Sequence, residues 1–293
     1  MTTTQDRYHD RLRRVLDHID RHPDEPLDLD RLSGIAAFSR HHFHRQFTAV
    51  LGMPVHRYVQ LARLDRAAHR LAYRRDVRIT DIAFDAGYDA PESLSRALRD
   101  RLGAGPSALR TAPDWPAWHA AFGPFHEARS RLMSTPYTNA AVTIERFDPV
   151  PVAILRHQGD PARIGDSIRR FIAWRRANGL TPAISATYNV FHDDPQTTAP
   201  ADYRLDLCAA TDRPIDPADG EVVAGTIPGG RCAVLRVTGD AGDLEQPARF
   251  LYREWLPRSG ERLRDFPLYC RRLRFYPDVP LGEAVAELYL PLE

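Results

Sequence analysis

The stretches IAAFSRHHFHRQFTAVLGMP, residues 35–54, and AGYDAPESLSRALRDRLGAGP, residues 86–106, repeat one pattern. In each, a tight turn leads into a helix that has one apolar face and one polar face, and a glycine ends that helix. The matching positions are Ala37 and Gly87, Phe43 and Leu94, Arg45 and Arg96, and Gly52 and Gly103. A helix, a turn and a second helix, occurring twice, predict a double helix-turn-helix domain.

Apolar residues at helical spacing predict further helices around these two units. The expected ranges are 8–22, 30–36, 39–51, 54–74, 80–87 and 89–103. Ser39 and Asp89 stand where the N-caps of the two second helices belong, and Asp89 and Glu92 have the spacing of a capping box. The long helix 54–74 is expected to hold the two units apart.

The distribution of charge separates the N-terminal part from the rest. The 293 residues contain 40 basic side chains, all of them arginine, and 39 acidic ones, so the formal net charge is +1. Residues 31–111 hold 14 arginines against 7 acidic residues, whereas residues 112–293 hold 21 against 24. A basic module suits contact with a polyanion, but arginine-rich helices also form ordinary solvated surfaces. Charge alone leaves both interpretations open.

Several function classes are not expected from the composition. An apolar fraction of 43% and a charged fraction of 27% are typical of a folded protein. No apolar run approaches the roughly 20 residues that span a bilayer, and the N-terminal residues lack the apolar core of a secretory signal. Cys208, Cys232 and Cys270 are too few and too scattered for a disulfide framework or a zinc cage. We therefore expect a cytoplasmic protein without membrane partners.

Catalytic and metal-binding motifs are also missing from the sequence. No Ser-His-Asp set or phosphate-binding loop stands out, and His41 and His44 lack a third ligand for a metal ion. The sequence thus predicts no catalytic residue, no cofactor and no metal.

Residues 112–140 interrupt the helical pattern with a Pro-containing stretch. Trp115, Trp118, Phe122 and Phe125 are too apolar for a solvated linker. We expect a connector that docks on one of two domains, residues 1–111 and residues 141–293.

The C-terminal part alternates strands with two helices and repeats internally. AILRHQGD from Ala153 matches AVLRVTGD from Ala233, and each copy continues with an amphipathic helix that ends in Trp and then Gly. The strands expected after these helices are 184–191 and 203–209 in one copy, and 266–275 and 284–290 in the other. Two strand–helix–strand–strand copies packed about a pseudo-twofold axis would share one core, with a groove at the seam. The fold class is therefore α+β multidomain, with an all-α N-terminal domain.

Candidate DNA contacts lie on the polar faces of the two second helices, because the second helix of a helix-turn-helix enters the major groove. These residues are Arg40, His41, His44, Arg45 and Thr48 in the first unit, and Glu92, Ser93, Arg96 and Arg99 in the second. Arginine can donate two hydrogen bonds to guanine, and histidine can donate to guanine N7 or to a phosphate. The alternative is that the histidines belong to a solvated surface, but the repeat and the net charge favour DNA contact. Glu92 could accept a hydrogen bond from cytosine or belong to the capping box. Pro91 suggests that the second unit is the less specific of the two.

The first hundred residues resemble the DNA-binding domain of the AraC/XylS family of bacterial transcription regulators. The resemblance covers residues 8–110 and rests on FSRHHFHRQF from Phe38, PVHRYVQLARLDRAAHRLA from Pro54, ITDIAFDAGYDAPESLSRAL from Ile79 and the closing GAGPSALR. It implies two recognition helices in successive major-groove faces of one DNA site, joined by a rigid helix. Tyr88 and Leu94 stand where phenylalanine is usual in the family.

Residues 142–291 resemble the GyrI-like effector-binding domain. The resemblance rests on ILRHQGD, YNVFHDDP, IPGGRCAVLRVTGD, EWLPRSG and the terminal AELYLPL. It implies a pocket at the seam for hydrophobic, often cationic, small molecules, and some members hydrolyse cyclopropane-containing toxins with a glutamate beside an aromatic residue. Here Tyr269 is followed by Cys270, Arg271 and Arg272, so the usual glutamate is absent.

The remaining pocket candidates are aromatic, acidic or thiol side chains. They are Tyr188, Trp255, Tyr269, Cys270 and Glu287. Each has a structural alternative: Trp255 has core spacing, Cys270 could be an inert thiol, and Glu287 would need a partner if buried.

These observations predict a regulator that binds promoter DNA and a small hydrophobic or aromatic effector, and that is not an enzyme. Because the family's usual glutamate is missing, we expect uncharged or acidic aromatic effectors rather than cationic ones. One alternative is a hydrolase of strained cyclopropanoid toxins fused to a DNA-binding module. Another is a C-terminal domain that holds a protein partner such as RNA polymerase.

Overall fold

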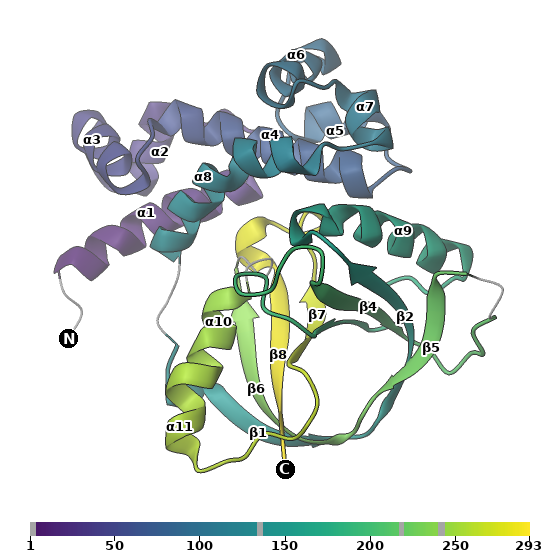
Figure 1. The fold of residues 1–293 in the computed structure, drawn as a ribbon. Coiled ribbons are helices and arrows are strands. Elements are labelled where there is room, and N and C mark those ends of the chain that lie inside the picture. Colours follow the sequence, from purple (N-terminus) through teal and green to yellow (C-terminus); the bar gives the residue numbers. More distant parts are fainter. Residues whose placement is uncertain (1–3, 134–136, 217–219, 240–243) are drawn as a thin grey trace. The chain divides into compact units, whose positions relative to one another are not determined.

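The computed structural model describes residues 4–133, 137–216, 220–239 and 244–293 of the chain. The chain forms two compact units (Figure 1). The first comprises Met1–Thr135 with Pro280–Gly282, and the second comprises Pro136–Val279 with Glu283–Glu293. Each unit buries apolar residues of its own.

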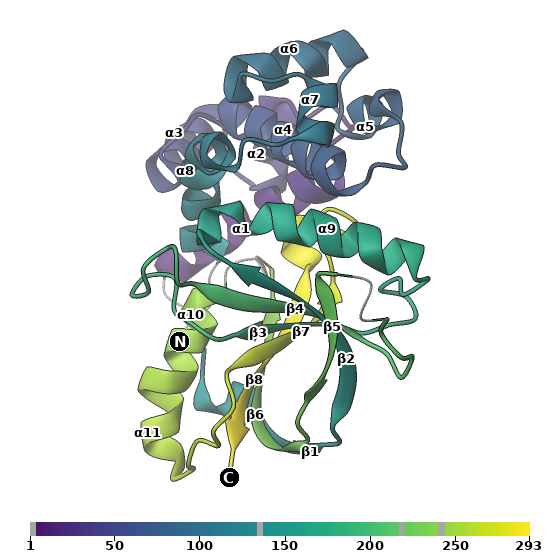
Figure 2. The same ribbon diagram turned by 45° about the vertical axis from the view of Figure 1, so that its right-hand side comes forward.

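Helices make up the first unit. They are α1 (Thr4–Arg21), α2 (Leu29–Ile35), α3 (Arg40–Leu51), α4 (Val55–Tyr73), α5 (Ile79–Asp85), α6 (Pro91–Leu102), α7 (Pro106–Thr111) and α8 (Trp115–Met133). The pairs α2–α3 and α5–α6 are the two expected helix-turn-helix units, and α4 runs between them (Figures 1 and 2). The all-α double helix-turn-helix prediction is confirmed.

The internal repeat extends to the backbone conformation of the turns. Ala37 and Gly87, which match in sequence, both have positive φ, 51° and 76°. Gly52 and Gly103 end α3 and α6 in the left-handed conformation, with φ of 69° and 68°. Positive φ is the conformation that favours glycine. Three of these four positions, Gly52, Gly87 and Gly103, therefore have the favoured residue, whereas Ala37 does not.

The predicted capping box at Asp89 and Glu92 is wrong. The N-cap of α6 is Ala90, and it makes no side-chain cap bond. Pro91 takes the first helical position, where its fixed φ suits the helix, so the helix starts one residue later than the capping box needs. Ser39 does occupy the N-cap position of α3, but its side chain makes no cap hydrogen bond.

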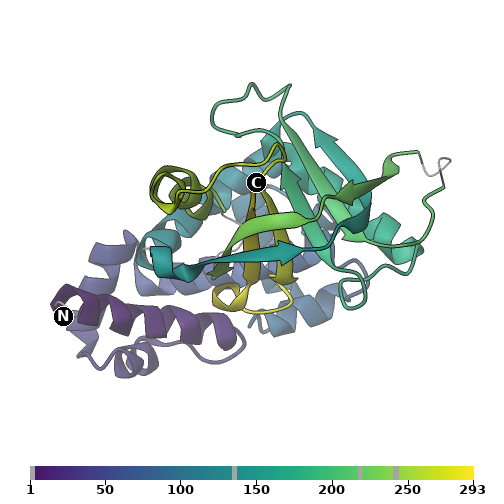
Figure 3. The ribbon, with the colours of Figure 1, turned by 90° about the horizontal axis from the view of Figure 1, so that it is seen from below.

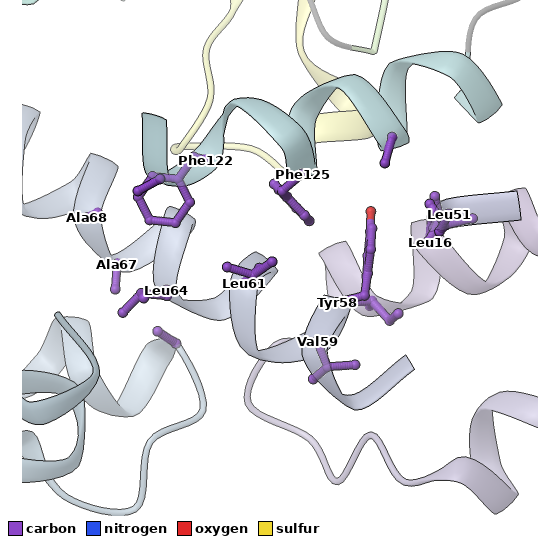
Figure 4. Packing of buried hydrophobic residues seen from close by; sticks show 14 of the residues in the cluster. Leu16, Leu51, Tyr58, Val59, Leu61, Leu64, Ala67, Ala68, Phe122 and Phe125 are labelled. Atoms are coloured by element: carbon purple, nitrogen blue, oxygen red, sulfur yellow. The ribbon is translucent and has the colours of Figure 1, made fainter. Parts of the chain in front are cut away.

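Helix α8 lies within residues 112–140, which the sequence predicted to be a connector without a regular helical pattern. Trp115, Trp118, Phe122 and Phe125 are all at most 4% exposed and join the core of the first unit. Figure 4 shows Phe122 and Phe125 beside residues of α4 such as Tyr58 and Leu61. Burial of these aromatic rings offsets the backbone hydrogen bond that Pro124, inside the helix, cannot donate.

The second unit is built on one antiparallel sheet. Its strands are β1 (Val142–Phe147), β2 (Val150–Gln158), β3 (Thr187–Phe191), β4 (Arg204–Ala210), β5 (Val222–Ile227), β6 (Gly230–Thr238), β7 (Tyr269–Arg274) and β8 (Val285–Leu292). They lie in the order β1-β6-β8-β7-β3-β4-β2-β5. Figure 3 shows the strands from below. The two predicted copies therefore meet at the central pair β3–β7, and the α+β fold class is confirmed.

The two copies exchange one strand each. β1 precedes the first copy in the chain but pairs with β6 of the second copy. β5 precedes the second copy but pairs with β2 of the first. This exchange ties the copies together along both edges of the sheet.

Helices cover one face of the sheet. They are α9 (Ile164–Ala177) in the first copy, and α10 (Glu245–Phe250), a π-helical turn (Leu251–Trp255) and α11 (Leu256–Ser259) in the second. Short 3₁₀ turns lie at Asn139–Ala141, Pro161–Arg163 and Leu281–Glu283. Leu155 and Leu207 cluster with Phe171 of α9, which lies along β2 and β4 (Figure 2), while Leu235 and Leu288 cluster with the other helices. Since side chains alternate along each strand, the neighbouring residues form a second, opposite face.

Candidate DNA interface and small-molecule site

The first recognition helix, α3, separates its core residues from its predicted DNA contacts. Phe43, Phe47 and Leu51 are buried in the core of the first unit. On the other side, the side chains of Arg40, His41, His44 and Arg45 are exposed. The structure therefore brings these four predicted residues together on one accessible, basic surface.

Thr48 and Arg40 differ in their surroundings from the other predicted DNA contacts on α3. The Oγ1 atom of Thr48 is buried and has no hydrogen-bond partner in the part of the chain that the structure describes, so Thr48 is less accessible than its neighbours. The guanidinium of Arg40 lies 2.8 Å from Asp30, and both side chains are more than 60% exposed. An exposed ion pair of this kind is worth little, so Arg40 can exchange Asp30 for a phosphate at small cost.

The second recognition helix, α6, repeats this arrangement. Its buried residues are Leu94, Leu98 and Leu102, and its exposed side chains include all four predicted contacts: Glu92, Ser93, Arg96 and Arg99. Because Glu92 has no capping role, its carboxylate is exposed in the first turn of the helix, where a cytosine amino group could reach it. Arg96 occupies on α6 the position that Arg45 occupies on α3.

The face of the sheet opposite α9 and α10 carries a cluster of tyrosines at the seam between the copies. Tyr269 and Tyr289, on β7 and β8, stack with ring centroids 4.8 Å apart and an interplanar angle of 4°. Across the seam, the Tyr188 ring on β3 lies 6.4 Å from that of Tyr269. Val152 and Val234 extend the cluster on either side. This aromatic surface is suited to a flat apolar ligand.

Glu287 adjoins these tyrosines and has two partners. Its carboxylate accepts a hydrogen bond of 2.8 Å from the Tyr289 hydroxyl and lies 3.0 Å from the Arg236 guanidinium. Burial, together with the bond to Glu287, raises the pKa of Tyr289, so this tyrosine stays a neutral donor. The partner that a half-buried carboxylate needs is therefore present. Arg271 faces Glu287 in the β7–β8 register.

The first copy holds an equivalent charged pair. Arg156 and Asp206 oppose each other in the β2–β4 register, as Arg236 and Glu287 do in the β6–β8 register. The Arg156 guanidinium donates two hydrogen bonds to Asp206, at 2.8 and 3.0 Å, and His192 Nε2 lies 2.8 Å from the same carboxylate. Although burial opposes it, these hydrogen bonds lower the pKa of Asp206.

Sequence reasoning missed Asp206, Arg156, His192 and Tyr289 as members of this face. For Arg156 a signal was available, because the matched segments AILRHQGD and AVLRVTGD place Arg156 and Arg236 at equivalent positions.

Trp255 and Cys270 are not brought to the tyrosine face. Cys270 follows Tyr269 on β7, so alternation along the strand sends its side chain to the helix-covered face. It is fully buried there, and burial raises the pKa of its thiol. Trp255 packs in the same apolar cluster. Tyr188, Tyr269 and Glu287 thus share one face, while the other two candidates support the core.

The described residues contain no group of three His, Cys, Asp or Glu side chains arranged to hold a metal ion. Within the same described ranges, no helix combines the length and the apolar character needed to cross a membrane.

The comparisons with known proteins agree with this two-part organisation. Residues 140–293 match the family model of the GyrI-like small molecule binding domain, and residues 32–112 match that of a helix-turn-helix domain. The chain is 36% identical over 152 residues to the probable transcriptional regulator YgiV of Escherichia coli K12, covering 52% of this chain and 95% of YgiV.

Other relatives match a smaller share of their own length. The right origin-binding protein of Escherichia coli K12 is 32% identical over 108 residues, 36% of this chain and 37% of that protein. The uncharacterized HTH-type transcriptional regulator YbfP of Bacillus subtilis is 33% identical over 104 residues, 36% of this chain and 35% of YbfP.

Proposed function

The chain belongs to the family of proteins with a GyrI-like small molecule binding domain, combined here with an AraC-type helix-turn-helix domain, and we propose that its DNA binding is controlled by a neutral or acidic aromatic effector. DNA binding itself follows from the helix-turn-helix domain. The relatives named as transcriptional regulators support a role without catalysis, in the cytoplasm where promoter DNA is reached.

The observation that carries the proposed effector class is the charge around the three tyrosines. The carboxylate of Glu287 is already bound by Arg236 and by the Tyr289 hydroxyl. Arg271 is exposed on the neighbouring strand and makes no ion pair within the described residues. A cation would have to displace Arg236 and would meet Arg271, whereas a carboxylate could accept hydrogen bonds from the Arg271 guanidinium.

Two probes built on the same naphthalene ring test the charge preference on the full-length protein. We expect the anion 1-naphthoate to raise the Tm more than the cation trimethyl(1-naphthyl)ammonium at equal concentration, because binding to the folded state raises its stability. Arg271→Ala should weaken naphthoate binding, measured by calorimetric titration, roughly tenfold, as loss of one charge-assisted contact implies. Arg253→Ala removes an exposed arginine from the helix-covered side and should leave binding unchanged.

Tighter binding of trimethyl(1-naphthyl)ammonium than of 1-naphthoate would contradict the proposed effector class. It would mean that Glu287 or Asp206 leaves its arginine partner to face the cation.

The hydrolase alternative has less support from this site. Hydrolysis with a glutamate needs a carboxylate that can act on water or substrate. Both Glu287 and Asp206 are hydrogen-bonded to arginine instead.

Contact of the C-terminal domain with RNA polymerase stays a prediction.

A further inference from the structure

Helix α8 contacts elements of both helix-turn-helix units. It packs against α3 of the first unit and α6 of the second, and also against the central helix α4 and the N-terminal helix α1. It lies between the two stretches that match family models, residues 32–112 and residues 140–293. Its contacts are therefore an addition to the DNA-binding module rather than a part of the matched domain.

The first half of α8 is bound to the second helix-turn-helix unit. The Arg101 guanidinium at the end of α6 donates a hydrogen bond to the backbone carbonyl of Ala121. Trp118 packs edge-to-face on His69 of α4, with ring centroids 4.9 Å apart. Phe122 is fully buried in the common core.

The second half of α8 is bound to α1 and to the start of α4. Arg129 is 1% exposed, and its guanidinium lies 2.5 Å from the Asp20 carboxylate of α1 and donates to the Tyr58 hydroxyl of α4 at 3.0 Å. The Arg13 side chain of α1 donates to the carbonyl of Leu132 at 2.8 Å. Removing a buried charge partner here would leave the other charge unpaired, so these contacts hold the helix in one position.

The middle of α8 is fixed to α4 by a buried carboxylate. Asp65 of α4 is 1% exposed, and its Oδ1 lies 3.1 Å from Nε2 of His126. His69, one turn further along α4, adds a contact of 3.4 Å to the same oxygen. A carboxylate without partners at this depth would be costly, so His126 joins α8 to the helix that carries both reading units.

We propose that α8 is a brace that fixes the relative orientation of the recognition helices α3 and α6, with His126 and Arg101 as positioning residues for two-site DNA recognition. The proposal rests on the DNA-binding assignment. Two reading helices on one rigid body bind DNA together, because the first contact places the second at high effective concentration. If α3 and α6 could move relative to one another, each helix could still contact its half of the DNA site, but the first contact would no longer favour the second.

The test compares three DNA fragments with the full-length protein. The first is the site enriched from a random DNA library, and the other two carry that site with one half or the other scrambled. For His126→Ala and Arg101→Ala, we expect affinity for the intact site to fall roughly tenfold while affinity for each half-site changes less than about twofold, as lost coupling requires. His126→Gln keeps a donor toward Asp65 and should restore the intact-site affinity. Glu127→Ala, an exposed position of α8, is the matched control.

A role in folding alone gives a different pattern. Partial unfolding reduces the active fraction, so it lowers the apparent affinity for all three fragments by the same factor. Equal losses on the three fragments, or no loss on the intact site, would overturn the brace. Failure of the wild-type protein to enrich any DNA site would instead contradict the DNA-binding assignment.

Discussion

At the scale of single residues, Arg45 is the strongest candidate for base readout. It is exposed on α3, and the repeat gives it a counterpart in Arg96 of α6. If its guanidinium donates two hydrogen bonds to guanine, Arg45→Ala should weaken binding to the cognate site by about 1–3 kcal/mol and binding to random DNA much less. Fluorescence anisotropy with both DNAs measures the two losses, with the exposed Arg14→Ala as control. Equal losses on both DNAs would show that Arg45 contacts only phosphate.

Asp206 gives a pH-dependent prediction at the same scale. Its carboxylate is nearly fully buried, and the hydrogen bonds from His192 and Arg156 lower its pKa in spite of burial. A lowered folded-state pKa stabilises the fold above the unfolded pKa of about 3.9, and this stabilisation is lost as pH falls through the folded-state value. Asp206→Asn should therefore cost about 1–3 kcal/mol at pH 5–7 and progressively less below about pH 3.9.

Hydrogen exchange of the β2 and β4 amides measures this loss separately from the helical unit. Glu254→Gln, at an exposed carboxylate, is the control and should show no such loss. If the free-energy cost of Asp206→Asn stayed the same down to pH 3, the negative charge of Asp206 would not contribute to the stability of the sheet.

At the scale of elements, the turns before α3 and α6 should respond to opposite substitutions, Ala37→Gly in the first and Gly87→Ala in the second. Gly52, which ends α3, is the reference for the second change: a Cβ on Gly87 would lie 2.1 Å from the carbonyl oxygen of Pro23, whereas a Cβ on Gly52 would meet open space. Both have positive φ, so Gly52→Ala should cost about 1–2 kcal/mol and Gly87→Ala clearly more. Ala37→Gly relieves the same backbone strain and should stabilise the protein slightly. Urea unfolding of the three variants measures the order, and equal losses for the two alanine variants would show that the Pro23 backbone moves aside.

The sequence predicted those elements whose pattern repeats. The repeat of residues 35–54 and 86–106 predicted α3, α6 and their glycine stops, and the repeat at Ala153 and Ala233 predicted the two strand–helix–strand–strand copies. Helix α8 was missed because Gly123 and Pro124 interrupt its pattern, and it forms because its apolar side chains are buried in the core of the first unit. The exchange of β1 and β5 was also missed, since either strand could pair with either copy by its local pattern.

The candidate site was predicted only in part, because a list of residue types does not say which face of a strand each residue occupies. Tyr188, Tyr269 and Glu287 reach the same face. Cys270 could have been separated from Tyr269 by strand alternation alone. Asp206 needed the β2–β4 register, which only the sheet order provides.

Across the full chain, the distribution of charge agrees with DNA binding by the first unit and not by the second. Residues 31–111, which carry both recognition helices, hold 14 arginines against 7 acidic residues. Residues 112–293 hold 21 arginines against 24 acidic residues, so the GyrI-like domain gives no general attraction to a polyanion. Binding to DNA should therefore weaken with salt in proportion to the phosphate contacts of the first unit.

The arrangement of the two recognition helices also sets how many chains occupy one DNA site. Both recognition helices belong to one chain and share one core, so a single chain can contact two successive major-groove faces about 34 Å apart along the DNA. We expect a complex of one chain with one asymmetric site, and native mass spectrometry of the complex measures this ratio. In such a complex Arg96→Ala should weaken binding as Arg45→Ala does, since each helix reads its own half. A strict two-chain complex on an inverted repeat, insensitive to Arg96→Ala, would show that α6 does not read DNA and that the second unit only supports the first.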